Sequence, residues 1–358
     1  MLQRRSWYAL CETIAHAVNR TDRRALVEAQ RPRFAPLALA LLSSIASSCG
    51  PDTRWKPAFD ATAVGWLMNV SGPSPTQLYA VGGAIDRGVV MQFDGARWTQ
   101  VSLGVEVPLL NWVHASSASD VTVVGMRGTA VRFDGTRWTR QSTPTTETLW
   151  GVWGASANDL WAVGGSGQFD GVPTIVHYDG SAWSAVALPT IRRADVHALF
   201  KVWGSSARDI YVVGQRGVVL HYDGAACAEL DVGASDDLVS LWGTSANNIV
   251  AVGGRGNGII SRWNGAQWRT QSLSPLPGLN GVWMRNATVA HAAGANGELV
   301  RIDLRDLRTT EFLGPGSMDF HSVFGDSSGR LTAVGGNLAL GGINPTGIAY
   351  TRLLAADE

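Results

Sequence analysis

The sequence contains few charged residues, and almost all of its cations are arginine. Charged side chains make up 16% of the 358 residues, and lysine occurs only as Lys56 and Lys201. The formal net charge is zero, so no global field would draw the chain to nucleic acid or to a membrane surface. The scarcity of charge argues against a disordered chain, whereas 42 glycines and 15 tryptophans are typical of short buried strands joined by tight turns.

Cysteine is also scarce, with only Cys11, Cys49 and Cys227 in the chain. We expect Cys11 to be removed with the N-terminal segment and Cys49 to be acylated, which leaves Cys227 as the only free cysteine of the mature chain. A secreted protein without a disulfide partner must be held together by packing.

The N-terminal segment is predicted to be a signal peptide. An arginine-containing flank precedes the apolar run Phe34–Ser48, which is too short and too interrupted by proline for a spanning helix. Residues 46–49, Ala-Ser-Ser-Cys, resemble a bacterial lipobox, in which the cysteine is acylated. We therefore assign residues 1–49 to a signal peptide with lipidation at Cys49. The alternative is an ordinary cleaved signal, and the true start could lie downstream, near Val27.

From residue 53 onwards the chain consists of seven copies of one repeat. The clearest copy is Leu149–Trp183, and a Val-Gly or Ala-Gly pair recurs at spacings of 39 to 50 residues, at 81–82, 124–125, 163–164, 213–214, 252–253, 293–294 and 334–335. Each copy divides into four short runs rich in aromatic and β-branched residues, as strands require. Self-similarity at this period is the mark of a repeat architecture.

The turn residues agree with this division. Asp-Gly or Asn-Gly pairs such as Asp94-Gly95 separate the third and fourth runs of five copies, and they predict type I′ turns with positive φ at both central residues. Copy six has Asp303-Leu304 at this place. Four-stranded antiparallel sheets that are apolar on both faces predict an all-β, seven-bladed β-propeller covering residues 50–358.

The last blade requires a strand from the other end of the chain. The seventh copy supplies three strands and then ends, whereas Thr53–Lys56 matches the fourth-strand segment of the other copies. We expect residues 54–58 to complete blade seven and to remove its open edge. A tryptophan recurs in the fourth strands, and Cys227 takes its place in blade four, so we interpret Cys227 as a small core residue.

These motifs also suggest a family. W-G-x-S-x-x-D-[IVL]-[WY]-[AV]-V-G followed by D-G-x-x-W resembles the repeat of secreted, often lipid-anchored propeller proteins that are common in myxobacteria and related bacteria. The resemblance covers residues 53–358, and it implies the fold and an extracytoplasmic location but no particular ligand. There is looser similarity to kelch and Asp-box repeats. The Asp-box has one residue between its Asp and its Gly, so sialidase chemistry is not implied.

No catalytic grouping emerges from the residue spacing. His177 and His221 share one third-strand position, which other blades fill with glutamine or arginine, so we interpret it as a polar surface position and not as a metal site. Tyr178 and Tyr222 are expected to pack. A copper site with a Cys–Tyr crosslink is disfavoured because Cys227 occupies a core position. We predict no catalytic residue, metal or cofactor.

Arginines gather at one place in the repeat. In a four-stranded blade the turns between strands two and three emerge on the same face as the connections between blades. Arg87, Arg127, Arg216 and Arg255 fall in the two–three turns, each before a glycine, and Arg192 and Arg193 lie in the longest connection. These six arginines are the candidate ligand-binding residues. The alternative is that Arg-Gly is simply a soluble turn.

The sequence thus predicts a lipid-anchored binding protein outside the cytoplasm, in the outer membrane or secreted, with no enzymatic activity. We expect a monomer whose partner in the cell envelope is an acidic glycan or an acidic protein, and no binding of nucleic acid. One alternative is an envelope assembly platform, architecturally similar to the propeller lipoprotein of the outer-membrane barrel-assembly machinery. Another is a glycan-active hydrolase or lyase, and the fold alone does not decide among them.

Overall fold

A computed structural model of the chain describes residues 53–166, 171–311, 314, 316–338 and 344–355. The predicted signal peptide and Cys49 lie outside the described residues. Within these ranges the regular structure is β-strand, apart from the short 3-10 turns η1 (Gln215–Gly217) and η2 (Ala295–Gly297). None of the helices in this part of the chain is long and apolar enough to cross a bilayer.

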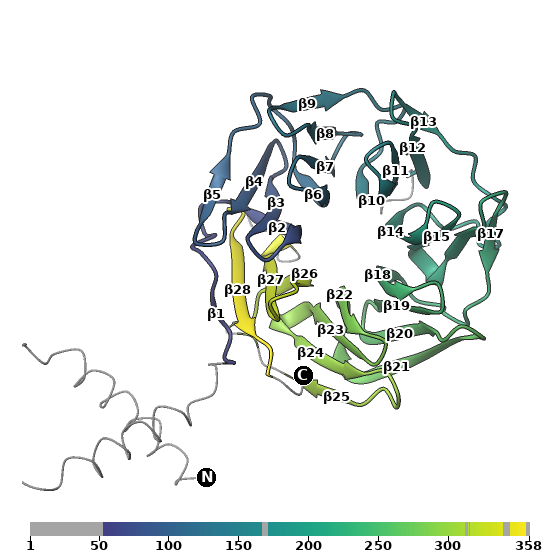
Figure 1. Cartoon of the computed structure of the whole chain (residues 1–358). Helices are drawn as coiled ribbons and strands as arrows, with labels where there is room; N and C mark the ends of the chain where they lie inside the picture. Colours follow the sequence, from purple (N-terminus) through teal and green to yellow (C-terminus); the bar gives the residue numbers. More distant parts are fainter. Residues whose placement is uncertain (1–52, 167–170, 312–313, 315, 339–343, 356–358) are drawn as a thin grey trace, which may run out of the picture. The chain divides into compact units, whose positions relative to one another are not determined.

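The strands form seven four-stranded antiparallel sheets arranged as a ring (Figure 1). The chain is therefore the seven-bladed β-propeller that the repeat predicts. In six blades the strands follow one another in chain order, with the first strand nearest the axis.

Blades one to three contain β2 (Trp66–Ser74), β3 (Gln77–Ala84), β4 (Arg87–Phe93), β5 (Trp98–Val101), β6 (Leu110–Ser117), β7 (Asp120–Gly125), β8 (Ala130–Phe133), β9 (Trp138–Gln141), β10 (Leu149–Ser156), β11 (Asp159–Gly164), β12 (Thr174–Tyr178) and β13 (Trp183–Ala185). Blades four to six contain β14 (Leu199–Ser206), β15 (Asp209–Gly214), β16 (Val219–Tyr222), β17 (Cys227–Leu230), β18 (Leu238–Ser245), β19 (Asn248–Gly253), β20 (Asn257–Trp263), β21 (Trp268–Pro277), β22 (Leu279–Asn286), β23 (Val289–Gly294), β24 (Leu299–Asp303) and β25 (Thr309–Glu311).

Blade seven joins the two ends of the propeller. It consists of β26 (Asp319–Gly325), β27 (Arg330–Gly336), β28 (Gly347–Leu353) and β1 (Lys56–Pro57). In Figure 1, β1 runs beside β28, with Lys56 opposite Thr351 and Pro57 opposite Tyr350. The fourth strand expected over residues 54–58 is thus two residues long, and Trp55 just before it packs against the apolar cluster between blades six and seven.

The hydrophobic core lies between the blades. Seven apolar clusters fill the seven blade-to-blade interfaces; one, for example, combines Tyr79 and Val81 of blade one with Val113 and Val123 of blade two. Both faces of each sheet are therefore apolar, which explains why the second strands show no alternation of polar and apolar residues.

The recurring Trp-Gly pair in the first strand is an interblade contact. A Cβ atom on Gly204 would lie 2.6 Å from the six-membered ring of Trp153 in the preceding blade, and one on Gly243 would lie 2.4 Å from that of Trp203. Each of these indoles therefore rests on the glycine of the next blade. Blade six has Met284 in place of this glycine, so the indole of Trp242 does not pack on a glycine of the next blade.

The prediction of type I′ turns at the Asp-Gly pairs was wrong. Gly95 has a φ of 95°, but Asp94 is not among the residues with positive φ; instead, its Oδ1 accepts hydrogen bonds of 2.9 Å from the amides of Ala96 and Arg97. The connection has four residues, so the aspartate caps the loop through its side chain and only the glycine needs a left-handed conformation.

The positive-φ pairs occur in the two–three turns instead. Arg216 has φ 56° and Gly217 has φ 75°, and the amide of Val218 donates to the carbonyl of Gln215 at 3.1 Å. This is the geometry of a type I′ turn. The same φ signs and the same hydrogen bond occur at Arg127-Gly128 and Asn296-Gly297.

Cys227 occupies the fourth-strand tryptophan position of blade four, as predicted. In blades one, two, three and five this tryptophan packs beside an aromatic residue of the third strand, with ring centroids 5.2 to 6.0 Å apart. Cys227 is partly buried and lines a cavity of about 230 Å³, where Tyr222 instead packs against Trp161 of blade three. Burial raises the pKa of the Cys227 thiol.

Candidate functional site

The first strands of the seven blades line a channel along the axis, and a pocket lies at each of its two ends. The second residue of the L-x-x-V-W-G motif lines one pocket and the fifth residue lines the other. We call these pockets the arginine mouth and the tryptophan mouth. The motif residues of the arginine mouth are Met68, Asn111, Trp150, Phe200, Val239, Asn280 and His321. Those of the tryptophan mouth are Ser71, His114, Trp153, Trp203, Trp242, Trp283 and Phe324.

The arginine mouth, of about 470 Å³, combines aromatic rings with charged side chains from neighbouring turns. Arg255 lines it, and the Arg255 guanidinium lies 5.5 Å from the ring centroid of Phe200. The indole of Trp150 is fixed by a 2.8 Å hydrogen bond from its Nε1 to the carbonyl of Gly165. This mouth opens on the face that carries the two–three turns.

One carboxylate joins two of the predicted arginines. Asp237 Oδ2 lies 2.7 Å from Arg255 Nε, and Asp237 Oδ1 accepts a 2.9 Å hydrogen bond from the Arg216 amide. The guanidinium of Arg216 pairs with Asp195 at 2.9 Å. Both arginine side chains remain more than half exposed. Arg255 therefore lines the mouth as part of an ion pair, whereas Arg216 is joined to Asp237 through its backbone amide and carries its own ion pair with Asp195.

The other four predicted arginines are spread over this face. Arg192 pairs with Glu229 at 3.2 Å and with Asp231 at 3.4 Å, and these contacts raise its pKa, the Glu229 hydrogen bond most. Arg87 donates to the carbonyl of Val64 at 3.2 Å. Arg127 and Arg193 are exposed and make no ion pair within the described residues. No contact in this part of the chain joins these four to Arg216 or Arg255.

Buried polar side chains lie between the two mouths. Lys201 Nζ donates to the carbonyl of Trp150 at 3.0 Å and lies 3.9 Å from the ring centroid of Trp112. Asn69, also buried, donates to Ser322 Oγ at 2.9 Å and accepts from the amide of Val113. These contacts satisfy the inner edges of the first strands. Burial lowers the pKa of Lys201 to about 7.

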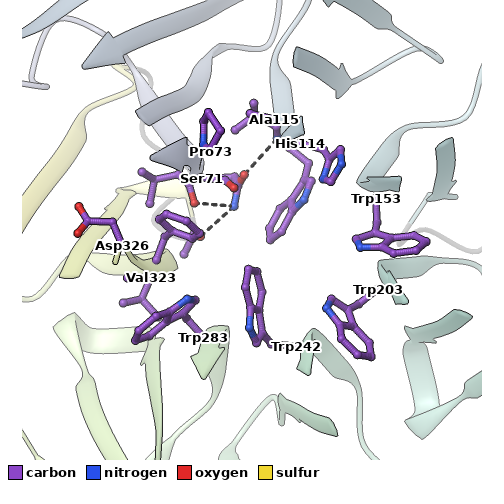
Figure 2. A pocket seen from close by; sticks show the side chains of 18 of the residues that line it. Ser71, Pro73, His114, Ala115, Trp153, Trp203, Trp242, Trp283, Val323 and Asp326 are labelled. Carbon is purple, nitrogen blue, oxygen red and sulfur yellow. Dashed lines mark hydrogen bonds between the residues drawn. The ribbon is translucent and has the colours of Figure 1, made fainter. Parts of the chain in front are cut away.

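The tryptophan mouth is a pocket of about 450 Å³ at the end of the channel where the one–two turns lie. In Figure 2, Trp242 points towards the middle of the pocket, whereas Trp153, Trp203 and Trp283 lie around its wall. Burial lowers the pKa of His114 to about 4, so this imidazole is neutral at pH 7. The carboxylate of Asp326 points away from the middle of the pocket.

The two third-strand histidines belong to separate pairs on the blades. His177 Nε2 lies 2.7 Å from Asp159 Oδ1, and His221 Nε2 lies 2.8 Å from Asp209 Oδ1. Each aspartate is the one that begins the second strand. Within the described ranges no three histidine, cysteine, aspartate or glutamate residues are placed to share a metal ion.

The aromatic residues of both mouths were missed by reasoning from sequence. The tryptophan of the W-G pair was interpreted as a packing residue because it recurs, although it also lines the tryptophan mouth. The second motif residue carried a usable signal, because it varies from Met68 to Trp150 to His321 while its neighbours repeat. A position that varies inside a regular repeat is not needed by the fold.

No protein-family model matches the sequence, and no curated protein matches it either. Solved structures do match. One is described as YCF48 from Cyanidioschyzon merolae, with a TM-score of 0.62 and 15% identity over 84% of this chain and 99% of that one. Another is described as YCF48 bound to D1 peptide, with a TM-score of 0.63 and 14% identity over 86% of this chain and 98% of that one. At this level of identity the similarity establishes the fold alone.

Proposed function

We propose that this chain is a binding protein without enzymatic activity that holds an acidic partner on the face that carries its two–three turns, around the arginine mouth. The observation that carries the proposal is the left-handed backbone of Arg127 and Arg216, with φ of 54° and 56°. An L-residue with a Cβ costs about 1 kcal/mol in this region, and asparagine is tolerated better. Blade six has Asn296 at the equivalent place, so the fold does not require arginine there.

The ion pairs around the mouth fit the same proposal. Arg216 and Asp195 are both exposed, and such pairs contribute little to folding, so Arg216 can exchange Asp195 for a ligand carboxylate at small cost. Arg255 keeps a more than half exposed guanidinium beside the more buried Asp237, and Phe200 next to it supplies apolar contact area. The similar structure whose description includes a bound peptide supports a polypeptide partner. With a protein partner, the chain would act as an assembly platform.

The proposal is tested with anionic probes. The variant with Arg127, Arg193, Arg216 and Arg255 all replaced by glutamine should bind polyglutamate or polygalacturonate at least about 10-fold more weakly at low salt, because screened Coulomb attraction is lost. Arg87 is left in place because it donates to a backbone carbonyl. The matched control replaces four exposed arginines outside the two–three turns, Arg97, Arg137, Arg208 and Arg308, and should bind like the parent.

The two probes separate the partner classes, and a pull-down from solubilised envelope identifies the natural one. Binding is measured at low and at high salt. If the quadruple arginine-to-glutamine variant binds with parental affinity at both salt concentrations, the arginines are only turn residues. A catalytic turnover of polygalacturonate by the parent would instead establish the glycan-active alternative.

We further propose that the chain works outside the cytoplasm and is anchored through an acylated Cys49. The lipobox-like residues before Cys49 support this proposal. Cys49→Ala should release the protein from the membrane fraction and abolish labelling with fatty acid. Unchanged membrane association of that variant would refute the anchor without affecting the binding proposal.

A further inference from the structure

The tryptophan mouth offers a second site, at the opposite end of the channel from the arginines. Its walls carry Trp112, Trp153, Trp203, Trp242 and Trp283. Its volume of about 450 Å³ falls within the range of small-ligand pockets, ~300–1,000 Å³. Concave sites of this kind, rich in aromatic side chains, are typical of binding pockets.

The indole N–H groups of this mouth have no partner within the described part of the chain. None of the five Nε1 atoms makes a hydrogen bond there, and none is sealed away from solvent. Indoles elsewhere in the blades do have partners: Trp161 donates to Asp159, and Trp183 donates to Gln141 at 2.7 Å. Since indole is a donor only, the mouth presents apolar faces and up to five free donors.

Some polar side chains of this mouth are engaged within the protein. Asn69 Oδ1 accepts from the Val113 amide, and Ser322 Oγ accepts from Asn69, whereas the Ser71 hydroxyl makes no hydrogen bond within the described residues. Asp326 Oδ1 is occupied by Ser328, and its carboxylate points away from the middle of the pocket. His114 is neutral at pH 7. A ligand that satisfies the five indoles must therefore offer acceptor oxygens and apolar surface, and it needs no charge.

We propose that the tryptophan mouth binds a proline-rich segment of a partner polypeptide. Proline has no backbone N–H, so such a segment offers carbonyl oxygens and apolar rings without leaving donors unpaired. It is already extended as a polyproline II helix and therefore loses little conformational entropy on binding to an aromatic surface.

Trp242 is the residue through which this site can be tested. It points towards the middle of the pocket (Figure 2). The next blade has Met284 at the position where a glycine packs against Trp153, Trp203 and Trp283. Its ring contacts Phe324 edge to face, with centroids 6.1 Å apart. Trp242→Leu removes the ring and the donor, whereas Trp242→Phe removes the donor and keeps an aromatic face.

The experiment is calorimetric titration of the full chain with a decaproline peptide, with a glycine-serine decapeptide and cellotetraose as comparison ligands. We expect saturable binding of decaproline only. Trp242→Leu should weaken it at least about 10-fold, and Trp242→Phe by about 3-fold or more, because central aromatic anchors dominate binding energy. The matched control Phe200→Leu, an aromatic residue of the arginine mouth, should bind decaproline like the parent.

Ionic strength separates this site from the arginine mouth. Decaproline binding should be the same at low and high salt, because no charged group takes part, whereas binding of anionic probes at the arginine mouth should weaken. The proposal is overturned if decaproline does not bind, or if both Trp242 variants bind it with parental affinity. It is also overturned if cellotetraose binds in its place with the same dependence on Trp242.

Discussion

Lys201 is buried near the propeller axis and makes no ion pair within the described residues. Its ammonium group is satisfied by the Trp150 carbonyl and the face of Trp112, which replace only part of its hydration. Burial therefore lowers its pKa to about 7. The Lys201 charge in turn acts on His321, whose pKa is lowered chiefly by burial and also by that charge.

The first prediction is a pH dependence of stability that belongs to Lys201. Its folded pKa lies below the unfolded value of 10.5, so between pH 7 and 10.5 the unfolded chain binds the extra proton. Stability should therefore rise with pH across this window, by up to about 4 kcal/mol. Urea denaturation from pH 7 to 10 should show the rise in the parent and its loss in Lys201→Met.

The matched control is Lys56→Met, which changes the only other lysine, an exposed residue of β1. It should keep the parental rise. An equal slope in the parent and in Lys201→Met would contradict the assignment.

At the scale of the strand, the Trp-Gly pair explains why the first strands of neighbouring blades approach so closely. The indole of Trp203 lies against Gly243, and that of Trp153 against Gly204, so each glycine is required by the blade before it. A repeat that looks local in sequence is therefore a contact between consecutive copies. The interface tolerates a larger side chain only where the indole turns inward, as Trp242 does beside Met284.

The second prediction tests this contact. Gly243→Ala places a Cβ 2.4 Å from the Trp203 ring, and the resulting overpacking should reduce the free energy of unfolding by about 1–3 kcal/mol. The matched control Gly256→Ala has no atom within 4 Å of the new Cβ. It should be neutral or slightly stabilising, because alanine restricts the unfolded chain. Equal stability of the two variants in urea would mean that Trp203 moves freely, contrary to the packing described.

The elements were predictable from sequence because each of seven copies repeats the same local pattern, so errors in one copy are corrected by the others. Turn type was not, because Asp94 and Gly95 lie in a four-residue connection that the dipeptide alone does not reveal. The carboxylates paired with Arg192 and Arg216 come from other turns and connections, so spacing within one copy does not show them. The tryptophan mouth was missed because the tryptophan of the Trp-Gly pair both packs between blades and lines the pocket.

At the scale of the whole molecule, blade seven is completed by the smallest strand. Lys56 and Pro57 pair with β28, the Ala58 amide donates to the carbonyl of Ala349 at 2.9 Å, and Trp55 adds packing against the cluster between blades six and seven. The Arg352 guanidinium also lies 6.0 Å from the Trp55 ring centroid. Without these residues β28 becomes an edge strand with unpaired amides and carbonyls.

The third prediction concerns this strand. A chain beginning at residue 59 should melt lower than one beginning at residue 53 and should aggregate more readily, because β28 is exposed. Trp55→Ala in the longer chain should cost about 3 kcal/mol. Thermal melting and light scattering measure both effects. A shorter chain that stays monomeric with unchanged melting would show that residues 53–58 contribute little to blade seven.

The short strand β1 also determines how the propeller responds to mechanical force. A pull on residue 53 reaches the rest of the chain first through β1, which is held by two paired residues and the Ala58 hydrogen bond that follows them, whereas each strand of blade one is held by at least four paired residues. We expect β1 to detach at lower tension than any other strand. Blade seven would then keep three strands, and its exposed edge, β28, could pair with a strand from outside. If the chain is tethered at Cys49, load on the tether would act on this strand first.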